Sequence, residues 1–266
     1  MQENIFSLTA ASDTEAFCFH IFSSASFKYL RVFRIYGNEF IRALRKVKVI
    51  TRNKFLKADI KKLWHKNAII LPPTIDYNLY IAKKRNPKYI TFINYSPIKG
   101  AIIFYNIARK LLAKKFLVID RYGLFKNKLR NVKVLSKVLD MKNIYKVTKI
   151  LLVPSLIEEG DCRVIHEAIV NKIPVIANNV KPLKYIWKKG VFFINIDKKN
   201  YNKKDFFFNP LYHIKTYEKY IKLINRLDSD KNFYNKACRE ARRQLKKVKT
   251  YQLKQTTKFI RMIKNL

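Results

Sequence analysis

Short apolar segments recur along the middle of the chain. They are continuous runs in which apolar and polar residues do not alternate, as is typical of strands buried on both faces of a parallel sheet. The runs are YITFIN (89–94), KFLVID (115–120), NVKVL (131–135), KILLVP (149–154), PVIAN (174–178) and VFFIN (191–195). Segments with helical spacing lie between them, at 99–113, 140–147, 163–171 and 181–188. This alternation predicts a doubly wound α/β fold with a Rossmann-type parallel sheet of about six strands.

The segments on either side of this α/β region have other patterns. Those after it are rich in lysine and carry Leu, Ile and Tyr on one side, which predicts amphipathic helices packed on the sheet. They are 213–227, 230–247 and 250–264. The part before it is predicted to begin with a basic helix at 27–46. Two strands, at 47–51 and 68–71, follow with a short helix at 53–63 between them, and a linker at 82–87 leads into the sheet. We therefore divide the chain into residues 1–84 and 85–266.

Glycine is scarce, with five residues among 266, so it is expected where the backbone geometry requires it. Gly100 and Gly160 each follow a predicted strand and precede a predicted helix. In a doubly wound sheet such loops lie at the carboxyl ends of the strands, where ligands bind. The free N–H groups at a helix start also attract phosphates there.

Acidic residues are also scarce, yet Glu158, Glu159, Asp161 and Glu167 fall within ten positions. A solvated acidic patch is one interpretation. The position of the cluster after a strand, in a strongly basic chain, favours a ligand site instead. Glu159 precedes the helix and Glu167 lies in its first turns, so their side chains can line the two ends of one elongated polar ligand. A nucleoside diphosphate sugar, with hydroxyls on both sides of its phosphates, has this layout.

The segment LLVPSLIEEGDCRVIHEAIVNKIPVIANNV resembles the signature region of glycosyltransferase family 4, which has the two-domain GT-B architecture. The matching elements include a Pro-Ser pair, two glutamates with seven residues between them, a Pro-Val-Ile strand, an upstream Lys-Gly pair and a tyrosine within a helix. They are Pro154-Ser155, Glu159 and Glu167-Ala168, Pro174-Val175-Ile176, Lys99-Gly100 and Tyr145. The resemblance covers about residues 47–200, and the order of its elements is more specific than any single motif.

The resemblance implies a retaining transferase that uses a nucleoside diphosphate sugar as co-substrate, with no cofactor and no metal ion. Glu159 would then be the catalytic residue, because it would accept a hydroxyl of the transferred sugar and orient it. Glu167 would bind the ribose hydroxyls, and Lys99 would bind the pyrophosphate. The remaining donor-binding residues contribute a hydroxyl or backbone N–H groups. They are Ser96, Gly100, Gly160, Asp161, Cys162 and Arg163.

Several features depart from the family pattern. Gly160-Asp161-Cys162 stands where the family usually has Gly-Phe-Gly, and no arginine precedes Lys99 in the segment NYSPIK. Only 46 residues precede the strand predicted at 47–51, which is short for an acceptor-binding domain. An incomplete gene, an acceptor fold supplied by a partner chain, and a non-catalytic remnant are all open. The expected fold is therefore GT-B-like with an incomplete N-terminal domain.

The net charge of +39, from 57 basic and 18 acidic residues, suggests a second hypothesis. A non-catalytic basic protein could reuse the fold to bind RNA or an anionic surface. The basic residues are spread along the whole chain, which a compositional bias also explains, and no nucleic-acid motif is present. We therefore do not expect a nucleic-acid partner. The basic helix at 27–46 leaves peripheral membrane contact open, and the resemblance leaves an envelope glycan or a lipid-linked molecule as acceptor.

The remaining signals have simple structural interpretations. No apolar run reaches 18 residues, and the first residues do not resemble a signal peptide. We therefore expect a cytoplasmic protein, and peripheral binding to the inner face of the membrane is left open. Asp228-Ser229-Asp230 matches a metal-binding Asp-x-Asp pattern but joins two predicted helices, where Asp and Ser serve as caps. His166 is interpreted as a histidine of the protein core or surface.

Overall fold

The computed structural model describes residues 19–22, 42, 46–126, 129–157, 159–196 and 214–264. Its largest element is a parallel sheet in the strand order β6-β5-β4-β7-β8-β9. The strands are β4 (Tyr89–Ile93), β5 (Phe116–Ile119), β6 (Val132–Leu135), β7 (Thr148–Val153), β8 (Val175–Asn178) and β9 (Val191–Ile194). Each of them falls within a predicted run, apart from the additional Thr148 at the start of β7. The predicted fold, a six-stranded Rossmann-type parallel sheet, is confirmed.

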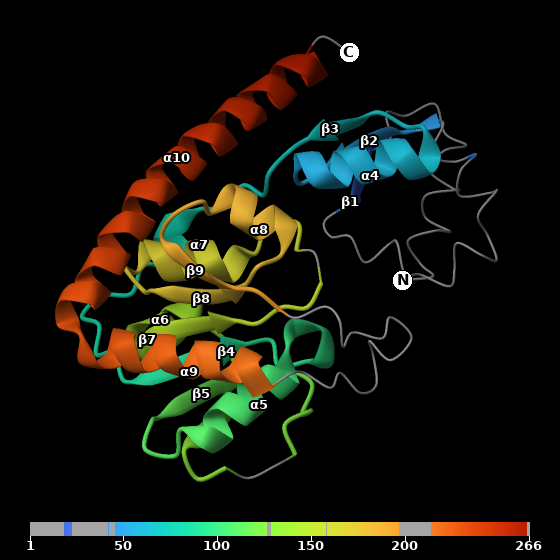
Figure 1. Cartoon of the computed structure of the whole chain (residues 1–266). Helices are drawn as coiled ribbons and strands as arrows, with labels where there is room; N and C mark the ends of the chain where they lie inside the picture. Colours follow the sequence, from blue (N-terminus) through green and yellow to red (C-terminus); the bar gives the residue numbers. More distant parts are fainter. Residues whose placement is uncertain are drawn as a thin grey trace.

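Helices cover both faces of this sheet, as Figure 1 shows. The helices of the sheet domain are α5 (Ala101–Lys110), α6 (Met141–Val147), α7 (Arg163–Val170), α8 (Lys181–Ile186), α9 (Ile214–Ser229) and α10 (Lys231–Lys264). Alternate side chains along β5 and β7 enter opposite cores. Leu151 and Val153 pack with residues of α6, α7, α8 and α10, and Ile150 and Leu152 pack with residues of α5 and α9. Burial on both faces explains why the strands are continuously apolar.

The C-terminal region differs from the prediction in one respect. The two helices predicted at 230–247 and 250–264 are one helix, α10, which spans 34 residues. No glycine or proline interrupts this segment, and the buried Val248 lies in the turn where a break was expected. The helix begins at Asp230, whose side chain accepts a hydrogen bond from Phe233 N at 2.8 Å. The predicted capping role is therefore confirmed for this aspartate.

The N-terminal unit is a three-stranded parallel sheet in the order β1-β2-β3. It consists of β1 (Phe19–Phe22), β2 (Lys48–Thr51), α4 (Lys54–Trp64) and β3 (Ala68–Ile70). The last three were predicted, whereas β1 was not. The segment 72–76 is an extended connection that ends at a short helix, η2 (Tyr77–Tyr80). The basic helix predicted at 27–46 falls almost wholly outside the described residues. No helix within the described ranges is both long and apolar enough to span a bilayer.

Candidate functional site

The strand order reverses between β4 and β7, because the chain builds outward from β4 to β6 and then returns to the other side of β4. In open parallel sheets the crevice beside the carboxyl ends of two such strands is the usual ligand site. The loop after β4 carries Gly100, and the loop after β7 carries Gly160. The expectation that these two glycines lie in adjacent carboxyl-end loops is therefore confirmed.

The two loops are in direct contact. Leu156 N donates a hydrogen bond to Ile98 O at 3.0 Å. Gly100 has a φ of +87°, and a Cβ atom on it would lie 2.1 Å from the carbonyl oxygen of Pro154. Both the left-handed backbone and the close approach therefore require glycine at this position.

Lys99 and Glu159 form an ion pair where the loops meet. The Lys99 ammonium group binds Glu159 Oε1, and the Ser155 hydroxyl donates to the same oxygen at 2.5 Å. The side chain of Glu159 is 10% exposed and that of Lys99 is 29% exposed, so the carboxylate is nearly buried and the ammonium group is partly exposed. One loop thus supplies a cation and the other a carboxylate whose orientation is fixed by a serine.

A buried asparagine at the end of the neighbouring strand β8 holds the loop after β7 through hydrogen bonds. Asn178, the last residue of β8, donates from its amide to Pro154 O at 2.7 Å and to Ser155 O at 3.1 Å. Its amide oxygen accepts a hydrogen bond from the Tyr220 hydroxyl of α9 at 2.8 Å. This support was not predicted from the sequence, where the only signal was a polar residue at the end of an apolar run.

Glu167 lies on the second turn of α7 and is 5% exposed. Its Oε2 accepts a hydrogen bond from the Tyr145 hydroxyl of α6 at 2.6 Å, and Arg163 Nε lies 3.8 Å from its Oε1. Burial raises the pKa of Glu167, while the Tyr145 hydrogen bond and the charges of Arg163 and His166 oppose that rise. The hydrogen bond from Tyr145 therefore fixes the orientation of the Glu167 carboxyl.

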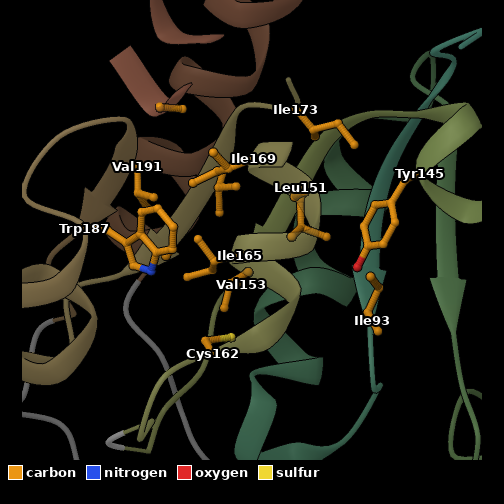
Figure 2. Packing of buried hydrophobic residues seen from close by; sticks show 14 of the residues in the cluster. Ile93, Tyr145, Leu151, Val153, Cys162, Ile165, Ile169, Ile173, Trp187 and Val191 are labelled. Atoms are coloured by element: carbon orange, nitrogen blue, oxygen red, sulfur yellow. The ribbon is translucent and has the colours of Figure 1, made fainter. Parts of the chain in front are cut away.

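Cys162 lies between the two glutamates. Burial raises the pKa of its thiol well above the ordinary value, the negative charge of Glu159 adds to the rise, and Lys99 opposes it. Burial likewise raises the pKa of the Tyr145 hydroxyl, and the charges of Glu167 and Cys162 add to that rise. The Cys162 side chain belongs to the core beneath α7, near Val153, as Figure 2 shows. The thiol is therefore part of the core, while the backbone of Cys162 lies at the start of α7, where helical N–H groups lack intrahelical partners.

Asp161 is directed away from the crevice. Its carboxylate binds His166 Nε2 at 2.6 Å and is 4% exposed. His166 Nδ1 lies 2.9 Å from the Tyr77 hydroxyl, which donates to Gln252 Oε1 of α10 at 3.1 Å. His166 is thus a histidine of the protein core, as expected, but its partners were not predicted. The side chain of Asp161 contributes to this buried chain of hydrogen bonds.

The N-terminal unit reaches the same loop through Asn53. The Asn53 amide donates to Gly160 O at 2.5 Å, and its oxygen caps α4 by accepting from Phe55 N and Leu56 N.

Ser96 and Arg163 are the remaining residues that the sequence predicted for the donor site. Ser96 precedes a short helix, η3 (Pro97–Lys99), and its backbone carbonyl accepts from Lys99 N. The Arg163 side chain is 58% exposed and donates to the Tyr80 hydroxyl.

Comparison with known proteins identifies the fold. No family model matches the sequence, and no curated protein matches it. Several solved structures are similar. HepE from Anabaena, in complex with UDP and glucose, has a TM-score of 0.74 and 14% identity over 100% of this chain and 76% of its own. A sucrose-phosphate synthase from Thermosynechococcus elongatus has a TM-score of 0.72 and 12% identity, over 99% and 72%. A glycosyltransferase from Rickettsia africae has a TM-score of 0.67 and 15% identity, over 98% and 74%.

These similarities show that the chain has the GT-B fold of glycosyltransferases. The chain spans about three quarters of the length of the three structures. At such low identity the similarity establishes the fold and does not identify a substrate.

Proposed function

We propose that this chain is a retaining glycosyltransferase that takes a sugar from a nucleoside diphosphate donor. The observation that carries the proposal is the pairing of Lys99 with Glu159 where the β4 and β7 loops meet, with Glu167 held on the following helix. Similar solved structures support the donor class, since HepE was solved with UDP-glucose and with UDP and glucose.

The chemistry of transfer matches these side chains. Breaking the bond between sugar and diphosphate leaves negative charge on the departing phosphate, and Lys99 with the start of α7 can stabilise that charge. Lys99 and Ser155 both bind Glu159 Oε1, which leaves Oε2 to accept a sugar hydroxyl. Glu167 Oε1 can accept ribose hydroxyls, because Tyr145 occupies Oε2. In this proposal the positive charge of Lys99, and not a metal ion, offsets the negative charge that develops on the departing nucleoside diphosphate.

We further propose that the chain belongs to family 4, acts in the cytoplasm, and transfers to a glycan or lipid-linked acceptor. The succession of motifs from Lys99-Gly100 to Pro174 supports the family. The acceptor would bind on the side of the N-terminal unit, whose Asn53 contacts the β7 loop.

The test is to separate binding from transfer. Glu167→Gln is expected to weaken UDP binding about 10- to 150-fold, because a charged hydrogen-bond acceptor contributes about 1.5–3 kcal/mol. Glu159→Gln is expected to slow sugar-nucleotide turnover by a similar factor while UDP binding changes little. Calorimetry measures the binding, and release of UDP from UDP-glucose and other UDP-sugars measures the turnover. Asp140→Asn, at the exposed cap of α6, is the matched control and should change neither.

Two outcomes would contradict the proposal. A wild-type protein that binds no nucleoside diphosphate, with guanosine and adenosine diphosphates tested beside UDP, excludes the donor site. Stabilisation by heparin or RNA, but by none of these nucleotides, in a thermal melt would favour a basic binding protein instead.

A further inference from the structure

A pocket is lined by residues that are not the proposed donor-binding side chains. It lies between the start of α4, the end of α8 and the middle of α10, and has a volume of about 160 Å³. A cavity of roughly this size holds a benzene-sized group. Lys99, Glu159 and Glu167 do not line it. Asp161 does, so the pocket and the donor site share the β7 loop without sharing their ligand-binding side chains.

Positive charge dominates the lining of this pocket. Its cationic residues are Arg52, Lys54, Lys188 and Lys247. Asp161 is the one carboxylate of the lining, and it is bound to His166. The ion pairs found in the described part of the chain include none of the four cations. Four cations beside a single, already bound carboxylate leave an excess of positive charge that a small anion would neutralise.

Three of the four cations have contacts with neighbouring groups. The Lys54 ammonium group lies 3.8 Å from the centre of the Tyr185 ring, and the Lys188 ammonium group lies 5.5 Å from the same ring. Arg52 donates to Leu71 O at 3.2 Å. Burial lowers the pKa of Arg52, and the charge of Asp161 partly restores it. Because both ammonium groups contact the Tyr185 ring, an anion bound beside this ring would be attracted by both charges.

The uncharged part of the lining fits an organic group. Tyr185, Ile186, Val248 and Tyr251 provide apolar surface beside the cations. A phosphomonoester combines nearly two negative charges and several acceptor oxygens with an organic part that such a surface can cover. We propose that this pocket binds a small phosphomonoester, with its phosphate among Arg52, Lys54, Lys188 and Lys247 and its organic part against Tyr185 and Tyr251. This proposal does not depend on transferase activity.

Phenyl phosphate is the probe, titrated calorimetrically into the full chain at about 0.15 M salt, where long-range attraction is screened. The double variant Lys188→Gln/Lys247→Gln is expected to weaken binding at least about tenfold, because charge-assisted hydrogen bonds are lost. Both lysines can be changed without disturbing a hydrogen bond found in the described ranges, and thermal melting checks that the variant is folded. Arg52→Gln should weaken binding further.

Lys231→Gln is the matched control, since Lys231 is exposed on α10 and lies sixteen residues, or about 24 Å, from Lys247. It should leave binding unchanged. Equal losses in the control and the double variant would show a non-specific response to the basic surface and overturn the proposal. Competition by UDP would overturn it as well, because the ester would then occupy the donor site. Inorganic phosphate should bind more weakly than phenyl phosphate, and equal binding would exclude the organic half of the site.

Vesicles of phosphatidylcholine with phosphatidic acid distinguish the source of the phosphate. Vesicle binding that phenyl phosphate displaces and the double variant abolishes supports the pocket with a lipid headgroup as ligand. Vesicle binding that phenyl phosphate does not displace, together with phenyl phosphate binding in the pocket, supports a soluble ester.

Discussion

Gly100 has both a left-handed backbone and no space for a side chain. Its φ of +87° strains any residue with a Cβ atom, and the carbonyl of Pro154 occupies the position of that atom. Gly123 has a φ of +64°, but among the described residues no atom lies within 4 Å of the position that a Cβ would take. Substitutions at these two glycines can therefore distinguish the cost of backbone strain from the cost of disrupting the contact between the β4 and β7 loops.

We expect Gly123→Ala to cost about 1 kcal/mol of folding free energy, which is the strain of the positive φ alone. Gly100→Ala should cost about 2–4 kcal/mol, because the β4 and β7 loops must also move apart. Urea unfolding at constant m-value measures both. UDP binding should fall in Gly100→Ala and stay unchanged in Gly123→Ala. Equal costs for the two variants would show that the loops separate without penalty.

Lys99, indicated by the family resemblance, and Glu159, indicated also by the acidic cluster, show how far the sequence predicts a site. Each follows a strand in sequence, and parallel strands place their carboxyl ends at one edge of the sheet. The sequence therefore predicted that the two loops would be adjacent. It did not predict the orientations of Asp161 and Cys162, whose side chains turn toward His166 and the core. His166 is only five residues from Asp161, but it contacts a tyrosine of η2. The core around Cys162 includes residues of α6 and α10, which are distant in sequence.

At the scale of the elements, Asp228 links α9 to the edge of the large sheet where its strands begin, opposite the edge with the Gly100 and Gly160 loops. It pairs with Lys114, just before β5, and with Lys149, at the start of β7. Burial opposes ionisation of this carboxyl, but the hydrogen bonds from the two lysines outweigh it and lower its pKa below the ordinary 3.8. The interpretation of Asp228 as a cap was wrong, since it lies within α9 and its carboxylate binds lysines 114 and 79 residues away.

Asp228→Asn should destabilise the fold by about 1 kcal/mol at pH 7, since the pairs are partly exposed and the two lysines lose their common partner. A carboxyl with a lowered folded-state pKa stabilises fully above its ordinary pKa and loses that contribution as the pH falls through the folded value. The difference between wild type and variant should therefore shrink below about pH 4. Chemical unfolding across pH measures it. UDP binding should not change, because Asp228 lies at the amino edge of the sheet.

At the scale of the whole molecule, Asn53 joins the N-terminal unit to the donor side. Its oxygen caps α4 and its amide holds Gly160 O, one residue from Glu159. Figure 1 shows the N-terminal unit beside the carboxyl edge of the large sheet. An asparagine can perform both tasks because it has an acceptor and a donor on one amide.

Asn53→Asp keeps the capping oxygen and loses the donor, whereas Asn53→Ala loses both. We expect Asn53→Ala to cost about 1–2 kcal/mol of stability. Asn53→Asp should preserve the cap yet weaken UDP binding by about tenfold or more, because a carboxylate would face the Gly160 carbonyl. Asp140→Ala removes a cap on α6 that does not touch the loop, so it should lower stability alone. Unchanged UDP binding in Asn53→Asp would show that the N-terminal unit does not position the donor loop.

The sequence by itself determined the strands, their parallel arrangement and the two loops that meet at the switch point. These follow from local patterns, because burial on both faces requires continuous apolar runs and a parallel sheet aligns their carboxyl ends. It also indicated Glu159 and Glu167 through the acidic cluster after a strand, and Lys99 through the resemblance to family 4. Only the tertiary structure decided the partners of these residues: Ser155 for Glu159, Tyr145 for Glu167, and Asn53 for Gly160. Ser155 lies only four residues from Glu159, but the other two contacts join residues 22 and 107 positions apart, so their geometry depends on how the helices and the sheet pack and not on any local period.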